Sequence, residues 1–184
     1  MNLSKLFFCI FLSVGTFVLA QQKSYVSQVW VADKGNGTYR NPILYADYSD
    51  PDACRVGEDF YMTSSSFNCL PGLQILHSKD LVNWSIIGAA IPYALPPVTT
   101  PERPEHGNRI WAPSIRYHNN FFYIYWGDPD QGVFMTKAPK AEGPWTEPVM
   151  VKEGKGIIDT CPLWDEDGKV YLVHAYARSE EHTS

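Results

Sequence analysis

Two aspartates, Asp50 and Asp159, and the indole of Trp111 are groups of this 184-residue sequence that could do chemistry together. Carboxylates that converge beside aromatic rings can hydrolyse a glycosidic bond: one carboxyl group protonates the leaving oxygen and the other acts as base or nucleophile. In the inverting form of that reaction, the acid and the base lie roughly 6.5 to 9.5 Å apart, which leaves room for a water molecule. The alternative is that each aspartate serves its local backbone, because Asp is also common in turns and caps.

These three residues begin three similar segments of the chain. DPDACRVGEDFYMT begins at Asp50, WAPSIRYHNNFFYI begins at Trp111, and DTCPLWDEDGKVYLV begins at Asp159. The first two segments align without a gap, and the same offset brings Trp84 onto Trp145. The alignment therefore predicts that Asp50, Trp111 and Asp159 occupy equivalent positions.

The segments predict one repeated run of strands. A first strand is followed by a tight turn (GED, HNN or DEDG) and by a second strand rich in aromatic residues. The third strands are LQILHS and GVFMTKA, and the fourth strands are expected to begin at Trp84 and Trp145. No stretch keeps a helical period for three turns, so the predicted fold class is all-β. Four-stranded units that repeat about every 40 to 60 residues are typical of β-propeller blades, which we prefer to a β-sandwich. Because first strands line the channel of a propeller, the three equivalent residues are expected to point into one funnel.

Five motifs in order carry a family resemblance: NPILYADYSDPDACRVGEDFYMTSSSF, LQILHSKDLVNW, RIWAPSIRYHNNFFYIYW, APKAEGPW and GIIDTCPLWDEDGKVYL. Together they resemble glycoside hydrolase family 43, in particular its β-xylosidases and α-L-arabinofuranosidases, from about Arg40 to Ala177. The resemblance implies a five-bladed β-propeller, of which about the first three blades are present, and inverting hydrolysis. Such an enzyme would cleave xylosidic or arabinofuranosidic linkages, and its partners would be saccharides derived from xylan or arabinan.

The resemblance also implies roles for individual residues. Asp50 would be the general base that activates water, and Asp159 would tune the pKa of the general acid and orient it. Phe67 and Trp111 would shape the sugar pocket. Asp52 departs from the small residue that is usual in the family, and with Asp47 it flanks the expected base.

The general acid of the family is a glutamate on the fourth blade, and no residue of this chain matches its motif. Glu180 and Glu181 lie in RSEEHTS, without a strand around them and without a following glycine. No cofactor or metal is required by the chemistry, although the resemblance allows a structural calcium ion in the channel. We expect the chain to be an N-terminal fragment, because five blades need roughly 280 residues.

Two other functions remain open from the sequence. One is a retaining furanosidase that acts on fructosides, whose first-blade motif usually reads Trp-Met-Asn-Asp-Pro where this chain has DYSDPD. The other is a non-catalytic carbohydrate-binding propeller that uses Trp111 and Phe67 as stacking platforms. The stereochemistry of the product and the effect of Asp50→Asn would separate these functions.

The ends of the chain predict processing and an added tail. Residues 1–20 have the layout of a secretory signal peptide, so we expect a secreted protein, periplasmic or extracellular, with no membrane association after cleavage. Residues 21–39 are expected to be a lead-in, and residues 40–177 a partial catalytic propeller. RSEEHTS, residues 178–184, is the translation of a common sequencing adapter, so native sequence is expected to end near Ala177.

Charge and cysteine content narrow the function classes further. A net charge of −5, from 15 Lys and Arg against 20 Asp and Glu, offers no basic surface for a nucleic acid. Cleavage of the signal would remove Cys9 and leave Cys54, Cys69 and Cys161, an odd number that predicts no complete disulfide framework. These three cysteines are expected to be buried, small apolar residues.

Overall fold

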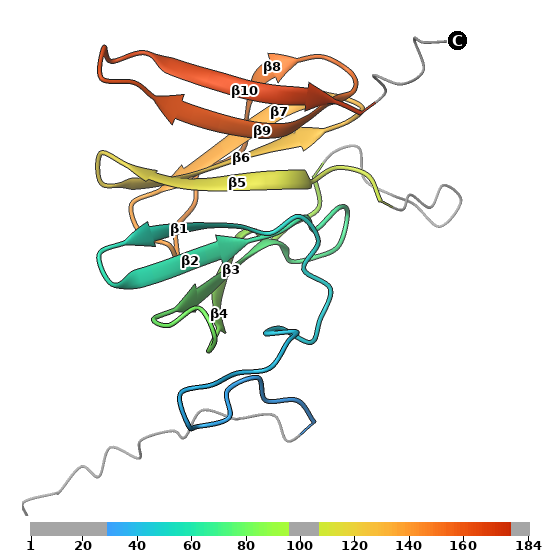
Figure 1. Cartoon of the computed structure of the whole chain (residues 1–184). Helices are drawn as coiled ribbons and strands as arrows, with labels where there is room; N and C mark the ends of the chain where they lie inside the picture. The colour runs from blue at the N-terminus through green and yellow to red at the C-terminus, as the bar shows by residue number, and fades with distance from the viewer. Residues whose placement is uncertain (1–28, 96–106, 178–184) are drawn as a thin grey trace, which may run out of the picture.

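A computed structural model describes residues 29–95 and 107–177, and within these ranges the chain forms strands and turns without a helix. The strands make two four-stranded antiparallel sheets and one two-stranded sheet (Figure 1). The first sheet comprises β1 (Asp52–Val56), β2 (Asp59–Thr63), β3 (Gly72–Ser78) and β4 (Ser85–Ile91). The second comprises β5 (Trp111–His118), β6 (Phe121–Asp128), β7 (Gly132–Ala138) and β8 (Val149–Glu153), and the third comprises β9 (Ile157–Trp164) and β10 (Val170–Tyr176). The all-β prediction is confirmed for these residues.

Turn chemistry sets the register of the three leading hairpins. The β5–β6 turn consists of Asn119 and Asn120, which both have positive φ, as a two-residue turn that follows the twist of a hairpin requires. Gly57 provides the left-handed residue of the β1–β2 turn, and Gly168 provides one in the longer β9–β10 turn. The turns predicted from GED, HNN and DEDG are therefore confirmed.

The predicted fourth strands are confirmed in the first sheet and wrong in the second. β4 begins at Ser85, directly after Trp84, but β8 begins at Val149 and not at Trp145. The Trp145 side chain packs against the core and donates its indole N–H to the Ala141 carbonyl at 3.2 Å. Pro148 has no N–H to donate to a strand ladder, so regular pairing starts only after it.

The main core fills the space between the first two sheets. Leu73, Ile75 and Ile91 come from the first sheet and are almost fully buried. Ile124 and the whole indole of Trp126 face them from the second sheet. Because alternate residues of a strand point to opposite faces, the inward residues of β3 and β6 meet in this layer while their neighbours point away.

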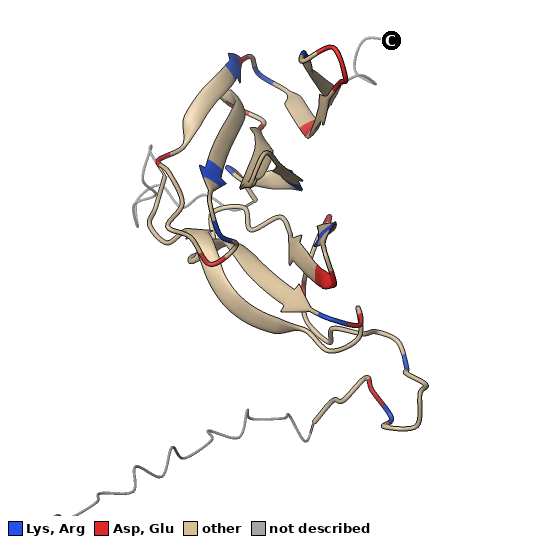
Figure 2. Cartoon of the chain, turned by 90° about the vertical axis from the view of Figure 1, so that its left-hand side faces the viewer, with Lys and Arg blue, Asp and Glu red and all other residues tan. Residues whose placement is uncertain are grey.

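A smaller core joins the second and third sheets. Tyr125, Val133 and Ile157 are its buried members, and Trp164 and Leu172 pack against them. The sheets therefore follow one another as successive layers along the chain (Figures 1 and 2).

Residues 29–46 form a short segment that leads into the first sheet and lies beside its outer end (Figure 1). The Trp30 ring stacks on Tyr45 at a centroid distance of 5.0 Å, and the Arg40 guanidinium lies 4.0 Å from the Trp30 ring centroid. The Asn83 amide donates to Asp33 at 2.9 Å and so ties this segment to the β3–β4 turn.

Basic and acidic residues are interspersed on the described chain (Figure 2). None of the described residues belongs to a helix with the length and hydropathy needed to span a bilayer. The signal peptide expected at residues 1–20 and the added tail expected at residues 178–184 lie outside the described residues.

Candidate active site

The candidate site lies where the three leading strands begin. β1, β5 and β9 lie side by side, and all three run in the same direction (Figure 1). Their first residues therefore share one end of the molecule. The loop that follows β2 ends at the same side, because β2 runs antiparallel to β1.

Each leading strand has the same irregularity at its start. In β5, Trp111 pairs with Gly127 and Ser114 pairs with Tyr125, so two residues of β5 lie opposite one residue of β6. In β9, two residues between Ile158 and Cys161 likewise lie opposite one residue of β10. Such an extra residue is a β-bulge, which bends the strand and re-aims the side chains at that point.

The chain before β1 follows the same pattern. The Ser65 N–H donates to the Ser49 carbonyl, and Asp52 is the next paired residue, opposite Thr63. One residue is again added between two pairs. We call this recurring feature the entry bulge of each hairpin.

The entry bulges correct the predicted equivalence of the site residues. The residue with left-handed backbone is Asp50 in the first bulge (φ 47°), Ala112 in the second (φ 36°) and Asp159 in the third (φ 54°). Trp111 precedes the equivalent position by one residue, so the prediction was wrong for the second hairpin. The ungapped sequence alignment uses one offset throughout, the offset that also brings Trp84 onto Trp145, whereas the hydrogen-bonded turns shift the leading hairpin by one residue.

Asp50 is exposed, and hydroxyl groups hold one of its carboxylate oxygens. Ser65 Oγ donates to Asp50 Oδ2 at 2.7 Å, and Ser49 Oγ donates to the same oxygen at 3.0 Å. Ser65 Oγ also accepts the Ala112 N–H at 2.7 Å. Asp50 Oδ1 accepts no hydrogen bond from the residues that the structure describes. Ser65 was not identified from the sequence, where it is one serine of the SSS run before Phe67.

Asp159 is also exposed and lies at the equivalent bulge of the third hairpin. Its neighbours on both sides in the chain fix its backbone, because Thr160 is buried and Ile157 belongs to the smaller core. Gly127 on β6 faces this backbone: a Cβ there would lie 2.7 Å from the Ile157 carbonyl oxygen. The structure thus places Asp50 and Asp159 at matching ends of two leading strands that flank β5.

Phe67 and Trp111 lie together, as expected for residues of one pocket. Their ring centroids are 6.3 Å apart with an interplanar angle of 81°, an edge-to-face contact. The backbone of Phe67 pairs with Ile110, the residue before Trp111. The Trp111 indole N–H donates to the Gly107 carbonyl, which fixes the ring.

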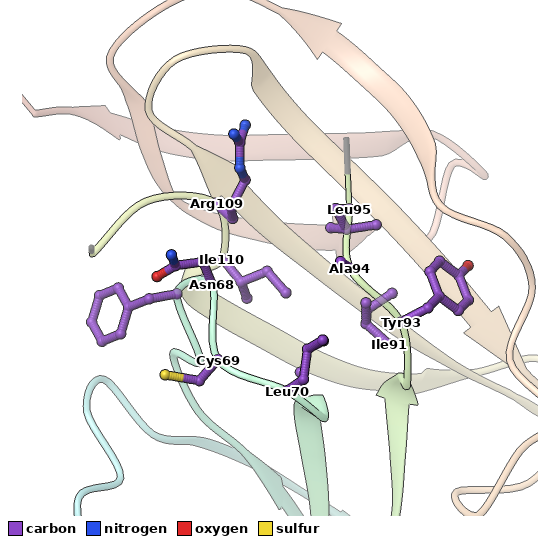
Figure 3. A pocket seen from close by; sticks show the side chains of 11 residues that line it. Asn68, Cys69, Leu70, Ile91, Tyr93, Ala94, Leu95, Arg109 and Ile110 are labelled. Atoms are coloured by element: carbon purple, nitrogen blue, oxygen red, sulfur yellow. The ribbon is translucent and has the colours of Figure 1, made fainter. Parts of the chain in front are cut away.

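A pocket opens beside this aromatic pair (Figure 3). Its lining combines apolar residues with Arg109, and its members include Phe67, Leu70, Ile91, Leu95 and Ile110. Arg109 is buried and lies 3.7 Å from a carboxylate oxygen of Asp128, which is also buried. This ion pair holds the backbone directly before Ile110 and Trp111.

A chain of polar contacts crosses the three leading strands just after the bulges. Asp52 Oδ2 accepts the Ile115 N–H at 2.8 Å and a guanidinium N–H of Arg116. The other Arg116 nitrogen donates to Cys161 Sγ at 3.0 Å. Burial disfavours the charged form of Arg116, but the neighbouring Asp52 carboxylate outweighs burial and raises the pKa of the guanidinium. Asp52 is therefore a structural partner of β5 in this chain.

The expected burial of the cysteines is corrected. Cys69 is exposed, and Cys54 and Cys161 are partly buried; all three are free thiols. Burial, with a smaller contribution from Asp52, raises the pKa of Cys54 to about 11, so this thiol is inert at neutral pH.

No three His, Cys, Asp or Glu side chains among the described residues gather in a way that would hold a metal ion. Glu180 and Glu181, considered for the general acid, lie outside the described residues.

Comparison with known proteins adds a family match. The family described as "Glycosyl hydrolases family 43" matches residues 39–184. A non-reducing end alpha-L-arabinofuranosidase of Bacteroides ovatus, BoGH43B, is 38% identical over 162 residues, which cover 81% of this chain and 28% of that protein. A beta-xylosidase of Formosa agariphila is 34% identical over 157 residues, which cover 83% of this chain and 26% of that protein.

Solved structures agree with these relatives. The crystal structure of the GH43 BlXynB protein from Bacillus licheniformis matches with a TM-score of 0.64 and 37% identity, over 74% of this chain and 29% of that one. The GH43 neighbours of known structure are β-propellers. The chain spans about a quarter of the length of the curated relatives that it matches.

Proposed function

We propose, given that this chain belongs to glycosyl hydrolase family 43, that it is the N-terminal part of a secreted, inverting glycosidase that cleaves xylosidic or arabinofuranosidic linkages. The observation that carries the proposal is the pair of exposed aspartates, Asp50 and Asp159, at equivalent entry bulges of leading strands that start at one end of the molecule. In this proposal the described sheets are the first blades of a five-bladed propeller, and later residues of the same enzyme complete it.

Asp50 acts as the general base. A water molecule between Asp50 and the sugar attacks the anomeric carbon, and its proton passes to a carboxylate oxygen of Asp50. The bond from the anomeric carbon to the leaving oxygen breaks at the same time, and that oxygen takes a proton from the general acid. Attack opposite the leaving group inverts the configuration at the anomeric carbon.

Asp159 acts on the general acid. A carboxylate near a second carboxyl group disfavours ionisation of that group, so Asp159 keeps the acid protonated until it is used. The acid itself is a glutamate supplied by a part of the enzyme outside the described residues. Phe67 and Trp111 present aromatic surface beside the two aspartates, where a pentose ring can stack.

The names of the relatives support the substrate class. Similar proteins are described as beta-xylosidase, non-reducing end alpha-L-arabinofuranosidase and xylan 1,3-beta-xylosidase. A xylosidic or arabinofuranosidic linkage of a xylan- or arabinan-derived saccharide is therefore the proposed substrate.

The proposal is tested in the longest polypeptide that the source gene encodes from Met1, called here the source polypeptide. Its activity is measured on 4-nitrophenyl β-D-xylopyranoside and 4-nitrophenyl α-L-arabinofuranoside, and the first-formed anomer of the sugar is identified by NMR. We expect turnover with inversion, and a fall of about 10³-fold or more in kcat for Asp50→Asn and Asp159→Asn, because each removes a group of the reaction. Asp47→Asn is the matched control, since Asp47 is a nearby exposed carboxylate outside the entry bulge.

Three results would contradict the proposal. Retention of configuration would favour the fructoside-type furanosidase. Sugar binding without turnover, unchanged by Asp50→Asn, would favour a carbohydrate-binding propeller. Equal activity of the Asp50→Asn and Asp47→Asn variants would show that Asp50 is not the general base.

A further inference from the structure

The hydroxyl of Ser65 bridges the first two hairpins at the candidate site. Its oxygen lies 2.7 Å from Asp50 Oδ2 and 2.7 Å from the Ala112 nitrogen. A hydroxyl group has one proton to donate and two lone pairs that accept. Because the Ala112 N–H occupies a lone pair, the single Ser65 proton is directed to Asp50.

The bridge connects equivalent positions. Asp50 and Ala112 are the left-handed residues of the first and second entry bulges. Ser65 is buried, with 8% of its surface exposed, and both hydrogen bonds are partly buried. Its own N–H donates to the Ser49 carbonyl at 2.9 Å, which holds the residue in place from the backbone side.

The two serine hydroxyls act on one oxygen of the base. Ser65 and Ser49 both donate to Oδ2 of Asp50, while Oδ1 accepts nothing from the described residues. A carboxylate held by one oxygen cannot rotate freely, and its other oxygen keeps a fixed direction. That second oxygen is then the one available to a water molecule.

We infer that Ser65 is a positioning residue for the general base: its hydroxyl fixes Asp50 Oδ2 against the backbone of the second hairpin and leaves Oδ1 to accept the proton of the attacking water. This inference rests on the proposed function. The proton of water goes to Oδ1, and Ser65 keeps its own proton throughout, so it takes no part in bond making or breaking.

The experiment compares Ser65→Ala, Ser65→Thr and Ser64→Ala in the source polypeptide. Threonine keeps the hydroxyl group, and Ser64 is a neighbour of similar burial (6% exposed) whose hydroxyl makes no hydrogen bond with the described residues. We expect Ser65→Ala to lower kcat about 10- to 100-fold with KM changed less than about twofold, because a mispositioned base affects the reaction more than binding.

The inference is supported if Ser65→Ala loses kcat with little change in KM, if Ser65→Thr largely restores the activity, and if Ser64→Ala leaves it unchanged. A Ser65→Ala variant with the kcat of the wild type would overturn the inference, as would equal losses in Ser65→Ala and Ser64→Ala.

If the wild-type polypeptide shows no turnover, the proposed function is contradicted. Hydrogen exchange then tests separately whether Ser65 bridges the two hairpins. The amide proton of Ala112 should exchange at least about tenfold faster in Ser65→Ala than in Ser64→Ala, because only the first variant removes its acceptor. Equal exchange rates would overturn the inference.

Discussion

At the residue scale, hydrogen bonds to a carboxylate also stabilise a turn away from the candidate site. Asp80 in the β3–β4 turn accepts bonds from the backbone N–H groups of Val82 and Asn83, from the Asn83 side chain and from Ser78. The Asn83 side chain contributes most, followed by its backbone N–H, and together these donors lower the pKa of Asp80 to about 2. The ionised side chain therefore closes the turn.

This predicts a pH-dependent contribution to stability. The folded-state pKa of Asp80 lies below its ordinary value of 3.8, so its stabilisation is complete above pH 3.8 and is lost as the pH falls toward 2. Asp80→Ala should lower the free energy of unfolding by about 1 kcal/mol at pH 6, the usual contribution of such bonds. Urea unfolding followed by tryptophan fluorescence should show this difference shrinking at pH 2.5. A constant difference at both pH values would contradict the assignment, and Asp47→Ala serves as the control.

At the element scale, the entry bulges decide which side chains reach the candidate site. Sequence patterns predicted β1 to β7, β9, β10 and the three turns, because strand periodicity and turn residues are local properties. The bulges were not predictable in this way. An extra residue in a strand changes no residue type, and it becomes visible only when pairs such as Trp111 with Gly127 are seen. For the same reason Ser65 could not be separated from Ser64 and Ser66, which have the same side chain.

Gly127 predicts how closely the second and third hairpins must approach. A Cβ at this position would meet backbone atoms, the Ile157 oxygen at 2.7 Å and the Ile158 Cα at 2.9 Å, which cannot rotate away. Gly127→Ala should therefore displace the start of β9 together with Asp159. We expect a loss of about 1 to 3 kcal/mol in the free energy of unfolding and a fall of kcat of about tenfold or more.

The matched control for this change is Gly88→Ala on β4. A Cβ there has its nearest neighbour at 3.4 Å, the Glu142 carbonyl oxygen, which is an ordinary contact. Both variants should be measured for thermal unfolding and for kcat in the source polypeptide. If Gly127→Ala behaves like Gly88→Ala in both measurements, the close approach does not position Asp159.

At the scale of the whole molecule, the outer face of the third sheet is apolar. Leu163, Tyr171 and Val173 share this face and are 59%, 45% and 64% exposed. Exposed apolar surface on a short antiparallel pair promotes association.

A polypeptide that ends at Ala177 should therefore self-associate, and Val173→Lys should reduce this. Light scattering after size-exclusion chromatography, at several protein concentrations, measures the mass directly. Leu81→Lys is the control, because Leu81 is an exposed apolar residue in the β3–β4 turn, away from that face. A monomer at all concentrations, or an equal effect of the two lysine variants, would contradict the prediction.

The three entry bulges share one backbone conformation but carry different side chains. One left-handed position recurs in each hairpin, and it carries aspartate, alanine and aspartate in turn. Aspartate accepts left-handed backbone more readily than alanine does, so the middle position could take a carboxylate without backbone strain. The fold thus has three equivalent left-handed positions at one end of the leading strands, and two of them carry an aspartate. For enzyme design, Ala112 is the equivalent position without a functional side chain, and a substitution there can introduce one without changing the backbone.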